Sequence, residues 1–210
     1  SFDNIQGFRD RLLRDEKMRT NRRPLRSCLT LEGTPQFGEG SLFQQGYYTF
    51  QDESSQLIAW LLDARPGEFI LDVCCGPGGK LTHIYELTQG EARVVGLDKN
   101  PKQLSKAREN LARLGHKGVE IVEGDFLEYA PDHQPDRILL DAPCSGLGVL
   151  RRHPEGKWRK TPAIVDTLVD VQTKLLEHSL KILKKGGVLV YSVCSFEPEE
   201  SLAHLKWLLD

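Results

Sequence analysis

Five short runs rich in Val, Ile and Leu recur along this chain and constrain its fold more than any other feature. They occupy residues 69–73, 93–97, 119–122, 137–140 and 188–193. Continuous apolar runs of this length are typical of strands buried on both faces, as in a parallel sheet. Helical segments separate most of them. We therefore predict an α/β fold with a Rossmann-like, doubly wound parallel sheet and helices on both faces.

The helical pattern is clearest in two segments. Pro101 suits the first turn of a helix over residues 101–114, whose apolar residues lie on one face. A longer helix follows the fourth strand, and its predicted apolar stripe consists of Ile164, Leu168, Val171, Leu175 and Leu183. In a doubly wound sheet the ligand lies at the carboxyl ends of the strands, so we look there for the site.

The first part of the chain has a different character. Residues 1–26 are charged and partly helical, and residues 28–49 hold short apolar pieces broken by glycine and proline, which indicate strands or loops. Asp52 suits the N-cap of a helix. We predict a charged N-terminal extension with short strands and loops over residues 1–50 and a main domain over residues 51–210.

Length and cysteine content narrow the class of protein. The 210 residues fit one ordinary domain, without a run approaching the roughly 20 apolar residues of a membrane span. Because the chain also lacks a signal pattern, we expect a cytoplasmic protein, and we expect a monomer. The chain starts without Met and ends inside an amphipathic pattern, so we expect a piece of a longer protein. Its cysteines are odd in number and lack both Cys-x-x-Cys spacing and histidines at ligand spacing, which predicts no disulfide framework and no metal site.

Charge is uneven along the chain. The formal net charge of -2 argues against a uniformly basic nucleic-acid binder, but it hides two basic clusters. The first cluster consists of Arg9, Arg11, Arg14, Lys17, Arg19, Arg22, Arg23 and Arg26. The second consists of Arg151, Arg152, Lys157, Arg159 and Lys160. Each is able to bind phosphates or to form a solvated face. The second lies beside candidate catalytic residues, which favours phosphate binding there.

A glycine-rich turn follows the first strand directly. It consists of Cys74, Cys75, Gly76, Pro77, Gly78, Gly79 and Lys80. Missing side chains let a ligand approach the backbone at the start of the next helix. The spacing matches neither a nicotinamide fingerprint nor a phosphate loop. The turn predicts a nucleotide-type cofactor site, with an ordinary tight turn as the alternative.

Acidic residues end the next two strands. Asp98 lies about 20 residues beyond the glycine turn, where a carboxylate is placed to accept hydrogen bonds from both ribose hydroxyls. Asp125 suits the exocyclic amine of an adenine, and Phe126 suits packing on its ring. Isolated residues of this kind are more often caps or turn formers. In series with the glycine turn they predict cofactor ligands.

Two thiols follow the last two strands. The fourth strand ends at Asp141, which precedes Pro143 and Cys144, and the fifth runs into Cys194. A lone cysteine near a strand is usually an inert core residue. Two at the ligand-binding edge of one sheet favour chemistry instead.

These residues resemble the Sun/Fmu/Nop family of RNA cytosine-carbon-5 methyltransferases over residues 41–201, and the lead-in over residues 46–56 is most similar to its bacterial small-subunit rRNA members. The matching segments are residues 51–56, 74–80, 150–154 and 157–158, and above all the pairing of Pro143-Cys144 with Cys194-Ser195. The resemblance implies an S-adenosylmethionine-dependent methyltransferase fold. Its cofactor ligands would be the turn residues 74–80 together with Asp98, Asp125 and Asp141.

The resemblance also implies a covalent mechanism. Carbon 5 of cytosine is a weak nucleophile, so a thiolate must first add to carbon 6. Cys194 would be this nucleophile, and Cys144 would serve the later loss of the proton from carbon 5, as the base itself or by ordering a water. Asp141 would hydrogen-bond the ring near N3 and the exocyclic amine. Lys80 would position either Asp141 or the carboxylate of the cofactor.

The expected substrate is RNA with an unstacked target base. Arg151, Arg152, Lys157 and Trp158 are the candidates for holding its phosphates and bases, with a purely structural loop as the alternative. The resemblance favours ribosomal RNA and hence a role in rRNA processing. A transfer RNA substrate, a non-catalytic RNA-binding or ribosome-assembly module, and a small-molecule methyltransferase are the competing readings. The retained cysteines, Lys80 and Asp141 argue against the last two.

Overall fold

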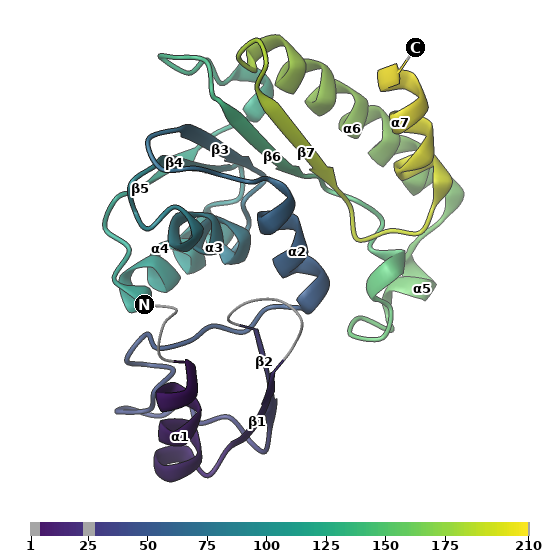
Figure 1. Ribbon diagram of the computed structural model, residues 1–210. Coiled ribbons are helices and arrows are strands. Elements are labelled where there is room, and N and C mark those ends of the chain that lie inside the picture. The colour runs from purple at the N-terminus through teal and green to yellow at the C-terminus, as the bar shows by residue number, and fades with distance from the viewer. Residues whose placement is uncertain (1–4, 23–27, 210) are drawn as a thin grey trace.

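The computed structural model describes residues 5–22 and 28–209, apart from the side chains of Arg22, Lys157 and Arg159. A five-stranded parallel sheet forms its centre, in the order β5-β4-β3-β6-β7 (Figure 1). The strands are β3 (Phe69–Val73), β4 (Arg93–Asp98), β5 (Val119–Glu123), β6 (Arg137–Asp141) and β7 (Val188–Ser192). Every pairing is parallel. The predicted doubly wound sheet is confirmed.

The order of the strands determines where a ligand can approach. The chain enters at the central strand β3, moves outward to β5, and then returns to β6 on the other side of β3. This reversal is the switch point of a doubly wound sheet, where the connections leave in opposite directions and open a crevice. The carboxyl ends of β3 and β6 are side by side there, with Val73 opposite Leu140.

Helices cover both faces of the sheet (Figure 1). One face packs against α2 (Glu53–Leu61), α3 (Gly79–Leu87) and α4 (Pro101–Leu114). The other packs against α6 (Pro162–Ile182), with Leu208 of α7 (Leu202–Leu209) at its margin. The remaining helical turns are η2 (Phe126–Glu128), η3 (Leu147–Val149), α5 (Gly156–Arg159) and η4 (Pro198–Glu200). Among these described helices, none has the length and apolar character required to cross a lipid bilayer.

The buried face of α6 differs in part from the predicted stripe. Leu175 is buried as expected, but Ile164 is 37% exposed. Gln172 and Ser179 lie in the interior instead, at 0% exposure. Both have partners there, since the Ser179 hydroxyl donates to Leu175 O and the Gln172 amide donates to Pro143 O. A polar residue with buried partners can occupy the inner face of a helix at little cost.

The N-terminal segment forms its own small cluster. It contains α1 (Ile5–Glu16) and an antiparallel pair, β1 (Arg19–Arg22) and β2 (Leu29–Glu32). Its buried residues are Leu12, Met18 and Leu42. The segment is held to α4 by Arg113, whose guanidinium donates to Phe43 O at 2.7 Å and to Tyr48 O at 3.0 Å. The boundary at residue 50 stays a prediction.

The first basic cluster is largely engaged within this segment. Arg11 and Arg14 both pair with Asp15, and the Arg11 guanidinium also lies over the ring of Tyr47. Arg9 donates to Thr20. Arg23 and Arg26 lie outside the described residues. The described arginines of α1 therefore act first as internal links, which favours a structural role for them.

Candidate functional site

The glycine-rich turn joins β3 to α3 at the switch point. Gly76 and Gly78 adopt φ angles of 54° and 83°, in the left-handed region that favours glycine. A Cβ on Gly78 would stand 3.1 Å from the Cβ of Ala107 on α4, so the turn is pressed against that helix. Cys74 shares the left-handed conformation, with φ of 59°. The backbone of the turn is thus held in one tight conformation.

The thiols of the turn are not reactive groups. Burial raises the pKa of the Cys74 thiol to about 12 and raises that of Cys75 as well. Cys75 is only 7% exposed and packs in the core beside Leu81. Both side chains therefore stay protonated, and the turn offers a ligand its backbone rather than its sulfur atoms.

Asp98 lies where the sequence predicted it. Its carboxylate accepts from Gly76 N at 2.9 Å and from Asn100 N at 2.8 Å, which ties the end of β4 to the glycine turn. Because each carboxylate oxygen has two lone pairs, Asp98 retains capacity to accept from a ligand.

Asp125 and Phe126 have local roles of their own. Asp125 is exposed at the end of β5 and caps η2 by accepting from Leu127 N at 3.0 Å. Phe126 is 3% exposed and packs edge-on against His178, so it is a core residue. The sheet and α6 already enclose its ring, which disfavours the expected place on an adenine ring.

Lys80, Asp141 and Ser192 form a hydrogen-bonded group at the ends of β6 and β7. The Lys80 ammonium donates to Asp141 Oδ2 at 2.6 Å, and the Ser192 hydroxyl donates to Asp141 Oδ1 at 2.6 Å. Of the two partners predicted for Lys80, Asp141 is the one that Lys80 contacts in the structure. The carboxylate is fixed through both oxygens while its side chain remains 35% exposed.

Cys144 and Cys194 are in contact. Their sulfur atoms are 3.2 Å apart as free thiols, and Cys194 N donates to Cys144 Sγ at 3.3 Å. A hydrogen bond from Cys144 lowers the pKa of Cys194 to about 7, whereas the same contact raises the pKa of Cys144. Of the two thiols, Cys194 is therefore the one that ionises first, with Cys144 as its hydrogen-bond donor. The predicted meeting of the two thiols at one sheet edge is confirmed.

Gly148 supports Cys194 and was not predicted from the sequence. Its amide in η3 donates to Cys194 O at 2.9 Å. A Cβ at this position would stand 3.0 Å from that oxygen and 3.2 Å from its carbon. Only glycine lets η3 come this close to the backbone of Cys194.

Asp72 is a second residue for which the sequence predicted no role. It is 0% exposed, and neither carboxyl oxygen has a hydrogen-bond partner among the described residues. Burial, with the neighbouring charge of Asp141, holds the pKa of Asp72 well above its usual value. Because Asp72 is neutral, it does not compete with Asp141 for the positive charge of Lys80.

The predicted RNA-binding residues lie in the loop after Cys144. Arg151 is exposed, and Trp158 is 81% exposed. Arg152 forms an ion pair with Asp52 at 2.5 Å, which ties this loop to the start of α2. The side chain of Lys157 lies outside the described part of the chain. The loop therefore combines exposed groups with one anchored arginine.

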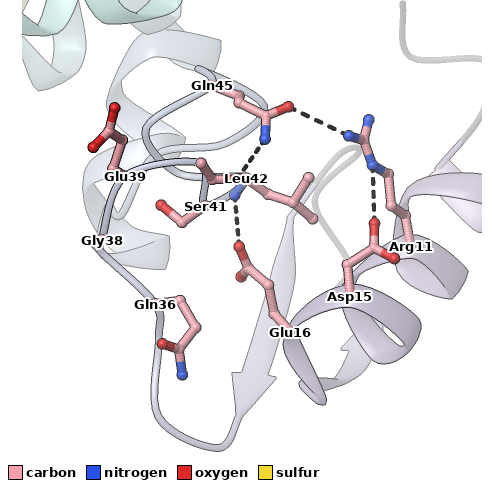
Figure 2. Close-up of a pocket in the computed structure, with 10 residues that line it drawn as sticks. Arg11, Asp15, Glu16, Gln36, Gly38, Glu39, Ser41, Leu42 and Gln45 are labelled. Atoms are coloured by element: carbon pink, nitrogen blue, oxygen red, sulfur yellow. Dashed lines mark hydrogen bonds and ion pairs between the residues drawn. The ribbon is translucent and has the colours of Figure 1, made fainter.

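A pocket elsewhere in the molecule does not compete with this site. It lies in the N-terminal segment between α1 and the loop over residues 36–45, and Figure 2 shows Arg11, Asp15 and Glu16 along one side of it. None of the predicted catalytic or cofactor-binding residues lines this pocket. The Leu42 amide and the Gln45 side chain bridge it to α1.

Known proteins with similar sequences agree with this picture. The probable ribosomal RNA small subunit methyltransferase B of Synechocystis sp. is 42% identical over 170 residues, which cover 80% of this chain and 38% of that protein. The ribosomal RNA small subunit methyltransferase B of Yersinia enterocolitica is 45% identical over 169 residues, which cover 80% and 39%. The chain thus spans about two fifths of the length of these relatives.

Solved structures with the same fold include two from Pyrococcus horikoshii. A methyltransferase homolog protein superposes with a TM-score of 0.83 at 31% identity, covering 100% of this chain and 67% of that one. NSun6 with SFG superposes with a TM-score of 0.77 at 33% identity, covering 84% and 45%.

A sequence profile of one family matches most of the chain. The match extends over residues 59–210 and so includes the sheet, the glycine turn and both cysteines. The chain belongs to the 16S rRNA methyltransferase RsmB/F family.

Proposed function

We propose that this chain transfers a methyl group from S-adenosylmethionine to carbon 5 of a cytosine in ribosomal RNA, through a covalent adduct on Cys194. The observation that carries the proposal is the contact of two free thiols, Cys144 and Cys194, 3.2 Å apart beside Asp141. A methyltransferase that acts on an ordinary nucleophile has no use for this pair. Methylation at cytosine carbon 5 needs attack at carbon 6 first and loss of a proton afterwards, and the pair offers one thiol for each of these steps.

The glycine turn fits S-adenosylmethionine. In α3 the Thr82 amide is bonded to Gly78 O, and the amides before it in the first turn point out of the helix toward the switch point. These amides would hold the cofactor's carboxylate, and Asp98 would accept from its ribose hydroxyls. When bound, the cofactor supplies an electrophilic methyl group. SFG, the ligand of the related NSun6, is an analogue of it.

Asp125 remains our candidate for the adenine amine. Its cap of η2 occupies one oxygen, Oδ1, and leaves the other for a ligand. Asp125 is exposed at the end of β5, next to the strand that carries Asp98. It would therefore bind the base end of a cofactor whose ribose lies against Asp98.

Cys194 performs the first step. Its thiolate adds to carbon 6 of the cytosine and turns the ring into a nucleophile at carbon 5. We assign Asp141 to the exocyclic amine and the N3 edge of the ring, where its carboxyl group, once it carries a proton, can donate to N3 and so offset the negative charge that develops there during attack. Lys80 and Ser192 keep the Asp141 carboxyl group in one orientation, since each binds one of its oxygens.

Cys144 serves the last step. After transfer, the proton on carbon 5 must be removed before the Cys194 sulfur can leave carbon 6. The raised pKa of Cys144 suits a group that keeps its proton while Cys194 is an anion. Once Cys194 is bound to the ring, that hydrogen bond is gone and Cys144 can release its own proton to solvent. Its thiolate, or a water that Cys144 orders, then takes the proton from carbon 5.

The substrate assignment rests on the relatives and on the loop over residues 151–158. The relatives from Synechocystis and Yersinia are named as ribosomal RNA small subunit methyltransferases. Arg151, Arg152, Lys157 and Trp158 follow Cys144 in the chain, and they are our candidates for the cations and the aromatic ring that phosphates and unstacked bases require.

The direct test is methylation of unmodified small-subunit ribosomal RNA with labelled S-adenosylmethionine, followed by nucleoside mass spectrometry. We expect label in 5-methylcytosine, and none when Cys194 is replaced by Ala. Transfer RNA is the parallel substrate. Label at another base, or normal turnover by Cys194→Ala, would contradict the proposal.

A further inference from the structure

Behind the two cysteines lies a buried carboxylate that the mechanism above does not use. Glu200, the last residue of η4, is 0% exposed. Its Oε1 accepts from Ser145 N at 2.8 Å and from Gln172 Nε2 at 3.0 Å, and its Oε2 accepts from Ser145 Oγ at 2.5 Å. Burial raises the pKa of Glu200, but hydrogen bonds from Ser145, Ser195 and Gln172 outweigh it and lower the pKa. The group is therefore a buried anion.

This anion connects the two loops that carry the thiols. Ser145 follows Cys144 in the chain, and Ser195 follows Cys194. The two serine hydroxyls are 3.0 Å apart, and Ser145 is bonded to Glu200 through both its amide and its hydroxyl. The β6 and β7 loops are thus joined on one side by the sulfur contact and on the other by serines that converge on Glu200.

Further contacts hold Glu200 itself. The amide nitrogen of Gln172 reaches both Glu200 and Pro143 O, so α6 supports the same loop. His204 of α7 contacts Gln172 Oε1 through Nε2 at 3.0 Å. Burial lowers the pKa of His204, which keeps its ring neutral. The Tyr191 hydroxyl donates to Glu200 O at 2.8 Å. Two helical elements, α6 and η4, therefore meet at this carboxylate with the loops, and α7 supports it through Gln172.

We propose that Glu200 is a positioning residue that sets the contact between Cys144 and Cys194 by fixing Ser145 and Ser195. The inference rests on the proposed use of both thiols in methyl transfer. A buried charge is costly, and an apolar residue of similar volume often stabilises a fold as well or better. The cage around Glu200 instead holds two loops in register at the point where their sulfur atoms meet.

The contact has a property that can be measured without RNA or cofactor. The Cys194 thiolate depends on the hydrogen bond from Cys144, so its pKa reports the separation of the two sulfur atoms. Alkylation by iodoacetamide follows the thiolate, and mass spectrometry of the Cys194 peptide isolates this residue from the other cysteines. We expect the pH–rate midpoint to rise from about 7 in the intact protein by about one unit in Glu200→Ala, toward the ordinary thiol value.

Two milder variants keep the inference testable if Glu200→Ala does not fold. Glu200→Gln keeps an oxygen for Ser145 N and Gln172, and the serine hydroxyls can reverse to accept from its amide, so its shift should be less than half that of Glu200→Ala. Ser145→Ala keeps Glu200 but removes the hydroxyl that contacts both Glu200 and Ser195, and it should shift the midpoint in the same direction. Either a folded Glu200→Ala or a Ser145→Ala with an unchanged midpoint overturns the inference.

A matched control separates positioning from general loss of stability. Arg137, at the opposite end of β6 from Asp141, is also buried, and it forms an ion pair with Glu68. Arg137→Gln should destabilise the fold while leaving the Cys194 midpoint in place. An equal shift in this variant would mean that any destabilising change loosens the thiols, and Glu200 would then have only a structural role.

Methyl transfer provides the second readout. At pH 7 a rise in the thiol pKa from about 7 by about one unit leaves roughly a fifth of the thiolate, so kcat should fall about fivefold in Glu200→Ala. The KM for S-adenosylmethionine should not change. If the alkylation midpoint shifts as expected but the intact protein methylates no RNA, the proposed function fails and the positioning role stands. If the intact protein methylates RNA and the midpoint does not shift, the positioning role fails alone.

Discussion

The Cys194 thiol ionises near neutral pH because Cys144 donates a hydrogen bond to its sulfur atom. An ordinary thiol has a pKa near 8.5, so few of its molecules are thiolates at pH 7. The hydrogen bond from Cys144 brings the pKa of Cys194 to about 7. The two thiols are therefore unequal before any substrate binds, and this inequality agrees with the roles proposed for them.

The rate of adduct formation should follow this ionisation. As pH falls below about 7 the thiolate is lost, and the single-turnover rate should fall about tenfold per pH unit, with a plateau above about pH 8. Rapid-quench measurements from pH 5.5 to 9 would record the profile. In Cys144→Ala the midpoint should rise, because the donor is gone. A profile that is flat across this range would contradict the assignment of Cys194.

Gly148→Ala should reduce activity more than stability. The added Cβ would stand 3.0 Å from Cys194 O, so the backbone of the nucleophile must move by a few tenths of an ångström. We expect kcat to fall at least about tenfold, since misplacement of a reacting group by 1 Å costs about a hundredfold. Steady-state kinetics together with urea unfolding would measure both effects.

Gly38→Ala is the matched control for this change. Nothing lies within 4 Å of a Cβ at Gly38, and its φ is not in the left-handed region. Its kinetics should equal those of the intact protein. If Gly148→Ala also retains full activity, the approach of η3 to Cys194 has no catalytic importance.

At this scale the sequence predicted the residues whose chemistry is visible in a motif. The meeting of Cys144 with Cys194 followed from two thiols at neighbouring strand ends, and the Lys80–Asp141 pair was one of two stated options. Glu200 and Gly148 were not predicted. Neither has a local signal, since each is identified only by what other loops bring beside it in space.

Strand β6 runs from a structural ion pair at its start to the candidate functional site at its end. Arg137 begins it and donates to Glu68 and to Leu62 O, and Asp141 ends it. Removing one partner of a buried pair leaves the other charge uncompensated. We expect Arg137→Gln to lower the free energy of unfolding by about 3 kcal/mol.

Urea denaturation checks this value, and Glu68→Gln in the Arg137→Gln background tests its cause. The double variant should recover part of the loss, because no unpaired charge remains. A single variant as stable as the intact protein would show that Arg137 is not holding β3 and β6 together at this end.

The helices show where periodicity succeeds and where it fails. On α4 the predicted face is correct, with Leu104, Ala107 and Leu111 all buried. On α6 the prediction failed at Ile164, because the inner face of that helix also carries Gln172 and Ser179. An apolar pattern cannot reveal a buried polar side chain whose partner, such as Glu200, comes from a distant part of the sequence.

In the whole molecule, the N-terminal segment approaches α4 closely at Gly46, in addition to the hydrogen bonds from Arg113. A Cβ on Gly46 would stand 2.1 Å from Arg113 O at the end of α4. We expect Gly46→Ala to loosen residues 41–50 from α4, so that their amides exchange hydrogen faster, while amides of β3, β4 and β6 keep their protection. Hydrogen exchange with mass spectrometry would record this difference.

Gly40→Ala separates backbone strain from the clash. Gly40 has a φ of 80°, close to the 77° of Gly46, but nothing lies within 4 Å of a Cβ there. Its exchange should change much less. If the two variants behave alike, the contact with Arg113 does not hold the segment.

The doubly wound sheet explains why the site could be placed from sequence while its support could not. The topology brings the ends of β3, β4, β6 and β7 to one edge, so residues that follow predicted strands must converge there. The positions of the helices around these residues depend on tertiary packing, which the sequence pattern does not reveal. The match to the RsmB/F family over residues 59–210 includes every strand of this sheet.

Trapping of the covalent intermediate is the most direct test of methyl transfer by two cysteines. Cys144→Ala is mixed with unmodified small-subunit ribosomal RNA and S-adenosylmethionine and resolved on a denaturing gel, beside the double variant Cys144→Ala/Cys194→Ala. We expect a slow-migrating protein–RNA band in the single variant, because attack by Cys194 proceeds and release does not, and no such band in the double variant. A band of equal intensity in both, or its absence from Cys144→Ala when the intact protein methylates the same RNA, would contradict the two-cysteine mechanism.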